Sequence, residues 1–179
     1  MRLTRERWTE AGLEALGEDG PAGLAADRLA RKLGVSRGSF YWHFKDAADF
    51  EAAVLGEWEQ RWTQRIIAAV EAGGGEPQAR LAALIAQTGG GDASLYGAAK
   101  RMAKRNPALA ELLGRVDDRR VRFVAELIAA GGLDEAEALL RARIVYAWAM
   151  GQMLIGDGGG PVDPTLAARL ADFAFRVMD

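Results

Sequence analysis

Apolar residues recur along most of this chain at helical spacing, and no stretch is convincing as a strand. The longest regular stripe steps by four residues throughout and consists of Phe50, Val54, Trp58, Trp62, Ile66 and Val70. Steps of four keep a stripe on one slowly drifting face of a helix. The pattern therefore predicts one long helix over about residues 47–72.

The same spacing, bounded by capping residues and glycines, predicts an all-α fold of about nine helices. Thr4 is placed to cap the first helix. Two later helices begin with a capping residue followed by proline at the first helical position, at Asn106-Pro107 and Asp163-Pro164. The predicted helices cover about residues 4–16, 25–33, 36–43, 47–72, 76–88, 93–104, 107–130, 134–155 and 164–178.

Three glycine triplets, at residues 73–75, 89–91 and 158–160, interrupt this pattern. Consecutive glycines rarely lie within helices, so we interpret the triplets as loops. None follows a strand-like run and none precedes the Gly-Lys-Ser or Gly-Lys-Thr sequence of a phosphate-binding loop. The triplets are therefore predicted to be connectors.

The segment over residues 29–44 has the pattern of two helices joined by a tight turn. Ala30 is small where two helices must cross closely, and Gly34 supplies the backbone freedom for a sharp turn. Ser36 is placed to cap the second, short helix. Four apolar side chains are expected to point inward and hold the crossing: Leu29, Leu33, Val35 and Phe40. This pattern is typical of a helix-turn-helix, whose second helix enters the major groove of DNA.

The residues left on the outside of that second helix suit DNA. They are Arg37, Gly38, Ser39, Tyr41, Trp42 and His43, followed by Lys45. Arg37 can form a bidentate contact with guanine, and Gly38 lets the helix approach the groove closely. Tyr41, His43 and Lys45 can reach phosphates, which fix the register of the protein on DNA. Two alternatives stay open, because Trp42 could instead pack against the first helix and His43 could be structural.

The charged residues favour DNA binding in only one short stretch of the sequence. The chain has a net charge of −2, and its first fifty residues carry eight basic and eight acidic side chains. Residues 28–45 nevertheless hold five basic side chains and no acidic one, with Asp27 and Asp46 directly outside this window. A local basic window is the electrostatic feature that a DNA-binding surface needs, although its members on the first helix of the pair could also be an ordinary solvated face.

Residues 34–45, GVSRGSFYWHFK, resemble the signature of the TetR family of bacterial transcription regulators. The resemblance covers about residues 3–58 in sequence, and the rest of the chain in the number and length of helices. It implies a helix-turn-helix DNA-binding domain over residues 1–46 and a helical ligand-binding and dimerisation domain over residues 47–179. It also implies that base contacts come from Arg37, Gly38, Ser39 and Trp42 or its neighbours, and phosphate contacts from Tyr41 and from His43 or Lys45.

Two departures from the family pattern weaken the expected DNA contact. Ala25 stands where many members carry a Thr or Ser that caps the second helix, and Ala47 stands where many carry a lysine. We therefore expect a modest affinity for DNA, or binding that also depends on Arg2, Arg5 and Arg28. The full set of residues expected to contact DNA is Thr4, Arg5, Arg28, Ser36, Arg37, Gly38, Ser39, Tyr41, Trp42, His43 and Lys45.

The last two predicted helices carry more apolar surface than an ordinary surface helix. Residues 144–155 are apolar on nearly all sides, so both faces of that helix must be covered. The resemblance implies dimerisation through these two helices, and a twofold homodimer would form a four-helix bundle and bind a palindromic operator. The alternative is a large monomer core. The expected interface residues are Ala142, Val145, Ala149, Gln152, Met153, Leu166, Leu170 and Phe173.

The resemblance also implies a small-molecule pocket among the middle helices. Aromatic and methionine side chains suit an adaptable apolar pocket, and no polar cluster indicates a particular ligand. The candidates are Trp58, Trp62, Tyr96, Met102, Phe123, Tyr146, Trp148 and Met150, each of which could equally be an ordinary core residue. A small apolar ligand would release a repressor from DNA by favouring a different spacing of its two reading heads.

Composition and motifs argue against several other classes of protein. The chain has no cysteine and one histidine, so no metal or other cofactor is expected. It carries neither a nucleophile elbow nor a nucleotide-binding fingerprint, so we expect no catalytic residue. No segment is long and apolar enough to span a bilayer and the start does not resemble a signal peptide, so we expect a cytoplasmic, nucleoid-associated bacterial protein. The alternatives to a repressor are an activator, a helix-turn-helix module for protein contacts and, less readily, a helical enzyme.

Overall fold

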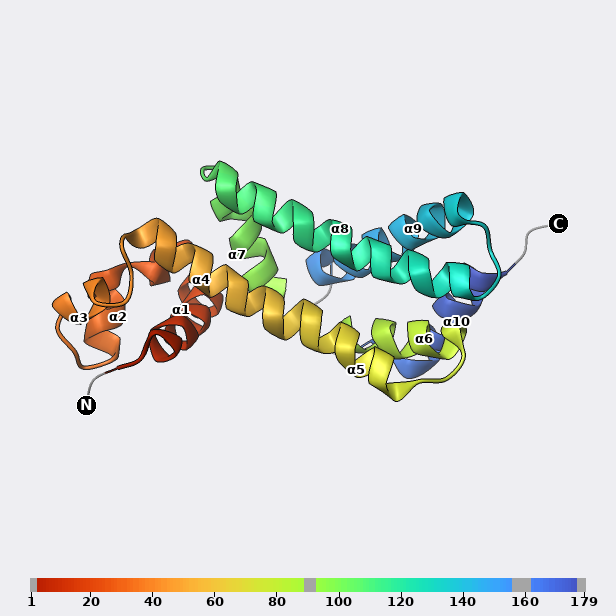
Figure 1. Cartoon of the computed structure of the whole chain (residues 1–179), viewed down its shortest axis with the longest axis horizontal. Helices are drawn as coiled ribbons and strands as arrows, with labels where there is room; N and C mark the ends of the chain where they lie inside the picture. Colours follow the sequence, from red (N-terminus) through yellow and green to blue (C-terminus); the bar gives the residue numbers. More distant parts are fainter. Residues whose placement is uncertain (1–2, 89–92, 156–161, 177–179) are drawn as a thin grey trace. The chain divides into compact units, whose positions relative to one another are not determined.

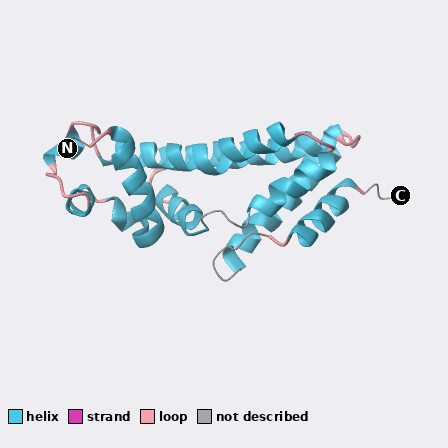
Figure 2. Ribbon diagram, turned by 90° about the horizontal axis from the view of Figure 1, so that it is seen from below, coloured by secondary structure: helices cyan, strands magenta, loops and turns pink. Residues whose placement is uncertain are grey.

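The computed structural model describes residues 3–88, 93–155 and 162–176, and all regular structure in these ranges is helical (Figures 1 and 2). The helical elements are α1 (Arg5–Asp19), η1 (a 3₁₀-helix, Gly20–Leu24), α2 (Ala26–Lys32), α3 (Gly38–Tyr41), α4 (Ala47–Glu59), η2 (a π-helical turn, Gln60–Gln64), α5 (Arg65–Gly73), α6 (Pro77–Thr88), α7 (Ala93–Ala103), α8 (Pro107–Ala130), α9 (Glu135–Ile155) and α10 (Pro164–Phe175). If α4, η2 and α5 are taken as one interrupted helix, the described residues contain nine helices, and the predicted all-α fold is confirmed.

The chain divides into two compact units. Unit 1 comprises Met1–Arg61 and Ser94–Leu113, and unit 2 comprises Trp62–Ala93 and Gly114–Asp179. The chain passes from one unit to the other three times, within η2, at the start of α7 and within α8. The predicted boundary between residues 46 and 47 separates a DNA-binding part from a ligand-binding and dimerisation part, whereas the two units are defined by their compactness. The predicted boundary therefore stays a prediction.

Unit 1 is built around an aromatic cluster from α1, α3, α4 and the α3–α4 loop. The rings of Phe40 and Trp8 lie 5.5 Å apart edge to face, and those of Phe44 and Phe50 lie 4.8 Å apart edge to face. All four side chains are at most 2% exposed. Edge-to-face pairs add stability beyond the burial of the rings themselves. Gly12 lets α1 approach α4, since a Cβ there would lie 2.5 Å from Cζ of Phe50.

The core of unit 2 combines large side chains from α6 and α8 with small ones from α9 and α10. Leu81, Ile85 and Ile128 are almost completely buried. The buried residues of α9 and α10 are mostly alanines, namely Ala138, Ala142, Val145, Ala149, Ala167, Ala171 and Ala174. Small side chains let helices approach closely, and α10 packs most extensively against α6.

The predicted long helix over residues 47–72 is wrong in one respect, because η2 interrupts it. A stripe that steps by four residues drifts by about 40° at each step around an ideal α-helix. A π-turn takes in more residues per turn and therefore offsets this drift. Phe50, Val54, Trp58 and Val70 are all buried as a result, although they span five steps of the stripe.

The capping predictions are confirmed at three helices and wrong at one. Side chains of Thr4, Asn106 and Asp163 accept backbone hydrogen bonds at the starts of α1, α8 and α10. Ser36 does not cap α3, which begins at Gly38 with no side-chain cap and is shorter than predicted. Of the loop predicted at residues 73–75, Gly74 and Gly75 are confirmed, whereas Gly73 is the last residue of α5. The triplets at residues 89–91 and 158–160 lie outside the described residues. No helix in the described ranges is long and apolar enough to cross a membrane.

Candidate nucleic-acid interface

Helices α2 and α3 form the predicted helix-turn-helix in unit 1 (Figure 1). Gly34 adopts φ +67°, a backbone conformation that side chains disfavour, so glycine is required at this turn. The backbone N–H of Val35 donates to the carbonyl of Ala30 over 3.0 Å and closes the turn. Leu29 and Phe40 are buried as predicted, whereas Leu33 and Val35 are half-buried.

Two large aromatic side chains lie exposed at the end of α3. Tyr41 is 52% exposed and Trp42 is 75% exposed. This exposure does not support the alternative in which Trp42 packs against the first helix, and its contact with DNA stays a prediction. Phe40, between them and the core, contacts Trp8 and Phe50, so the same short helix is anchored on one side and presents aromatic rings on the other.

Arg37 is held by its neighbours in the free protein. Its Nη2 donates to the Tyr41 hydroxyl over 3.0 Å, and its Nε lies 3.2 Å from Oδ1 of Asp27. The hydrogen bond with Tyr41, and then the charge of Asp27, raise the pKa of Arg37 above its already high ordinary value. The guanidinium is therefore always charged, and it must leave Asp27 to reach a base.

Gly38 begins α3 with open space around it. The nearest atom to a Cβ at this position would be Oγ of Ser36, at 3.8 Å. Nothing within the described part of the chain therefore requires a glycine here, in contrast to Gly34. Ser39 is half-buried beside it, and Ser36 is exposed.

Arg5 connects α1 to the end of the helix-turn-helix. It donates to the carbonyl of His43, forms a 2.9 Å ion pair with Oδ1 of Asp49, and lies 4.4 Å above the ring of Phe44. The hydrogen bond from Arg5, followed by one from the Lys45 backbone N–H, lowers the pKa of Asp49. Arg5 thus has a structural task, and its predicted contact with DNA stays a prediction.

Two of the other four basic residues of the window also have acidic partners. Arg28 lies 3.0 Å from Asp19, and Nζ of Lys32 lies 2.8 Å from Glu18. All of these pairs are exposed, so each contributes little and can be exchanged for a phosphate at small cost. Sequence reasoning missed these acidic partners, because only the fold shows that the end of α1 lies beside α2.

The remaining predicted DNA-contacting residues vary in their surroundings. Lys45 and Thr4 are exposed, and Thr4 also caps α1. His43 is half-buried, and its Nε2 is buried with no hydrogen-bond partner among the described residues. The structure thus joins Arg37 to Tyr41 and Arg5 to His43, while the contacts of all the predicted residues with DNA stay predictions.

The predicted pocket residues are divided between the units. In unit 1 the rings of Trp58 and Tyr96 lie 5.9 Å apart, and Met102 is buried. Unit 2 holds Trp62, Phe123, Tyr146, Trp148 and Met150. The Tyr146 hydroxyl donates to Asp117 over 2.7 Å, a polar contact that the sequence did not indicate. A single pocket lined by all eight residues stays a prediction.

The predicted dimer residues differ in how much surface they offer a partner. Ala142, Val145 and Ala149 are buried in the core of unit 2, and Gln152 is exposed. Leu166 and Phe173 are 45% and 58% exposed, and Leu170 is half-buried. The side chain of Met153 lies outside the described residues. The opposite face of α9 exposes two large apolar side chains, Leu140 and Ile144, at 55% and 49%.

Comparisons with known proteins agree with this arrangement. Residues 9–53 match the family model described as bacterial regulatory proteins, tetR family. The HTH-type transcriptional regulator SrpR of Pseudomonas putida is 42% identical over 52 residues, which are 29% of this chain and 24% of that protein. The class D tetracycline repressor protein of Escherichia coli is 47% identical over 45 residues, 25% of this chain and 21% of that protein. The chain thus spans less than a third of the length of these two relatives.

Solved structures extend the likeness to the whole fold. A transcriptional regulator from Rhodococcus sp. Rha1 has a TM-score of 0.77 at 23% identity, covering 97% of this chain and 94% of that one. A regulator from Saccharomonospora viridis, solved in complex with choline, has a TM-score of 0.75 at 21% identity, with 94% of each chain covered. The chain is thus similar to the TetR family in sequence over the helix-turn-helix, and its helical fold is similar to that of the solved regulators over nearly the whole chain.

Proposed function

We propose that this protein is a transcriptional repressor that binds a palindromic operator as a homodimer and is released by a small-molecule ligand. The observation that carries the proposal is α3, which buries Phe40 in the aromatic cluster and leaves Arg37, Tyr41 and Trp42 outside. A short helix that is anchored by its buried side and exposed on the other is suited to entry into the major groove. Such a regulator would work in the bacterial cytoplasm, at the nucleoid.

The start of α3 would read bases, and the following residues would position it. Arg37 would exchange Asp27 for the O6 and N7 atoms of a guanine. Gly38 leaves room for the helix to approach the groove. Tyr41 and Lys45 would bind phosphates on either side, which sets the register without selecting the sequence. The exposed ring of Trp42 would contact a thymine methyl group or the sugar-phosphate edge.

Dimerisation would cover the exposed apolar faces of α9 and α10. The most exposed large apolar side chains of these two helices are Leu140 and Ile144 on α9, and Leu166 and Phe173 on α10. We propose these residues in the interface, with Leu140 and Ile144 in place of the buried Ala142, Val145 and Ala149. Two helices from each protomer would then form a four-helix bundle across the twofold axis.

The test is DNA binding by matched variants. An operator obtained by selection from random duplexes should bind Arg37→Ala and Tyr41→Ala at least about ten-fold more weakly than the wild type, because bidentate base contacts and phosphate contacts are lost. Arg65→Ala, an exposed arginine in unit 2, is the control and should bind normally. Normal binding by both α3 variants, with the dimer intact, would contradict the proposed reading helix.

A further inference from the structure

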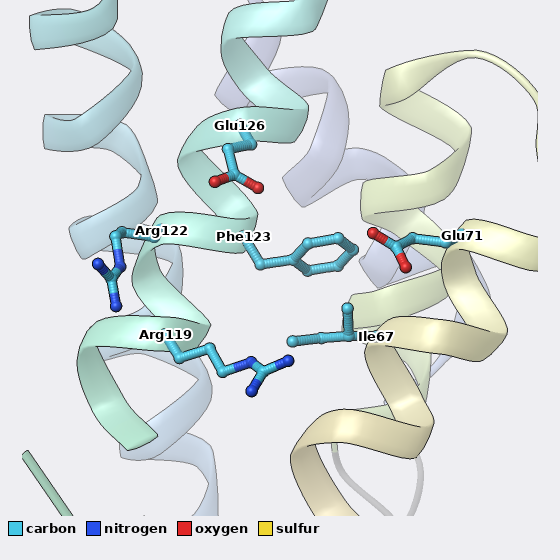
Figure 3. A pocket seen from close by; sticks show the side chains of 6 residues that line it. All are labelled: Ile67, Glu71, Arg119, Arg122, Phe123 and Glu126. Carbon is cyan, nitrogen blue, oxygen red and sulfur yellow. The ribbon is translucent and has the colours of Figure 1, made fainter. Parts of the chain in front are cut away.

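Helices α5 and α8 border a cleft of about 370 Å³ within unit 2 (Figure 3). Small-molecule sites range from roughly 300 to 1,000 Å³, so the cleft can hold a ligand of metabolite size. Its lining residues are Ile67, Glu71, Arg119, Arg122, Phe123 and Glu126. Of the residues predicted to line a pocket, this cleft contains Phe123 alone, so it is a different site from the apolar pocket expected from the sequence.

The cleft has an apolar floor and four charged lining residues, of which Arg119 on α8 and Glu71 on α5 lie on its two sides. Phe123 extends from α8 toward α5, and Ile67 extends from α5 toward α8 (Figure 3). Phe123 is 7% exposed and Ile67 is half-buried. The guanidinium of Arg119 reaches from α8 toward Ile67, while the carboxylate of Glu71 points from α5 toward the Phe123 ring. A positive and a negative group therefore face one apolar surface from opposite helices.

Both charged groups are available to a ligand. The side chains of Arg119 and Glu71 make no hydrogen bond or ion pair with another residue in the described ranges. Acidic and basic side chains at suitable spacing do pair elsewhere in unit 2, as Arg141 and Glu137 do at 2.6 Å. The side chains of Arg119 and Glu71 thus pair neither with each other nor with a side chain one helical turn away.

We infer that this cleft binds a small zwitterion with an apolar side chain, the chemistry of a free apolar amino acid. Its carboxylate would pair with the planar fork of Arg119, and its ammonium group would donate to Glu71. The side chain would lie against Phe123 and Ile67. Because each charge in the cleft repels a ligand of its own sign, a purely anionic or purely cationic analogue is disfavoured. Arg119 and Glu71 are exposed, so we expect a dissociation constant on the order of 0.1–1 mM.

The neighbouring residue connects the cleft to η2. Arg120 Nε donates to Oγ1 of Thr63 over 2.9 Å, and its Nη2 donates to the carbonyl of Trp62 over 3.4 Å. Thr63 is 2% exposed, so this clamp fastens α8 to a buried part of the π-turn. π-turns are often functional irregularities in helices, and this one directly follows α4 in the chain.

A ligand held between Arg119 and Glu71 would therefore act on α8, which the Arg120 clamp fastens to η2, and on α5, which follows η2. A change in their spacing would shift the π-turn, and with it the helix that follows the helix-turn-helix. This regulatory step rests on the proposed function, whereas binding in the cleft does not. The zwitterion is then an effector that changes the affinity for the operator.

The cleft is tested by calorimetric titration of the full chain with L-phenylalanine and L-leucine. Two single-charge analogues, 3-phenylpropanoate and 2-phenylethylamine, should bind about five-fold or more weakly than phenylalanine. Arg119→Gln and Glu71→Gln should each weaken phenylalanine binding by a similar factor, while Arg115→Gln, an exposed arginine one turn earlier on α8, should not. Thermal melting checks that each variant is folded.

The outcomes separate the cleft from the proposed function. If neither amino acid binds, or if both variants bind phenylalanine as the wild type does, the inference is overturned even when the protein binds its operator. If phenylalanine binds as expected and leaves operator affinity unchanged, the regulatory step is wrong and the site stands. If the chain binds no DNA, the proposed function fails, and the titrations still decide whether the cleft is a zwitterion site.

Discussion

Replacing Asp27 with asparagine is expected to raise the affinity for operator DNA. In the free protein Asp27 holds Nε of Arg37 at 3.2 Å, and both side chains are 60% exposed. Base reading by Arg37 requires this ion pair to break. Asp27→Asn removes that competition and also removes a negative charge from the first turn of α2, next to the proposed DNA surface.

The size of the effect follows from the exposure of the pair. Exposed ion pairs are screened by water and salt and contribute little, so we expect binding to tighten by roughly two- to five-fold at low salt. The gain should shrink as salt rises, because the pair itself is then weaker. Loss of an acidic residue at the start of α2 should slightly lower the stability of the domain, since acidic groups favour helix N-termini.

The assay is fluorescence anisotropy with labelled operator at several salt concentrations. Glu10→Gln is the matched control, since Glu10 is an acidic residue of unit 1 that pairs with Arg7 and Arg61 and not with α3. It should leave the affinity unchanged. Unchanged or weaker binding by Asp27→Asn, with its thermal stability close to that of the wild type, would refute the idea that Asp27 restrains Arg37.

Four further substitutions test the fold and the interfaces. Gly12→Ala should lower the free energy of unfolding by about 1–3 kcal/mol in denaturant titrations, because the added Cβ overlaps the core ring of Phe50. Gly38→Ala should leave the free energy of unfolding nearly unchanged and weaken operator binding. Ile144→Lys should convert the dimer to monomers in analytical ultracentrifugation, because it places a charge in the proposed apolar interface. A variant that stays dimeric would exclude this face of α9 from the dimer interface. Hydrogen bonds to Asp49 lower its pKa below the ordinary 3.8, so they stabilise the folded state at pH values above 3.8. This stabilisation is lost as the pH falls through the lowered pKa. The difference in free energy of unfolding between the wild type and Asp49→Asn should therefore become smaller in acid unfolding curves.

Local signals in the sequence were sufficient to find the helices and the turn of the helix-turn-helix. Thr4, Asn106 and Asp163 cap the helices that they were predicted to cap, and Gly34 has the positive φ that its turn requires. These features depend on one residue and its near neighbours in the chain, which is why a single sequence is enough to identify them.

Features that depend on packing could not be predicted in the same way. A stripe with steps of four is compatible with both a straight helix and one with a π-turn, so η2 became visible only with the fold. Residues 144–155 of α9 are apolar on nearly all sides, so the inner face of this part of the helix could not be told from its outer face. Whether Asp27 contacts Arg37 depends on the angle between α2 and α3, which the spacing of charges does not determine.

The most direct test of the central claim is selection from random duplex DNA by the purified chain, refolded from denaturant to remove bound ligand and assayed at low and moderate salt. The account predicts enrichment of a palindromic consensus, with an affinity that falls steeply as salt rises. It also predicts loss of enrichment for Arg37→Ala. Failure of the folded, dimeric protein to enrich any sequence would contradict the assignment of α3 as a DNA-reading helix.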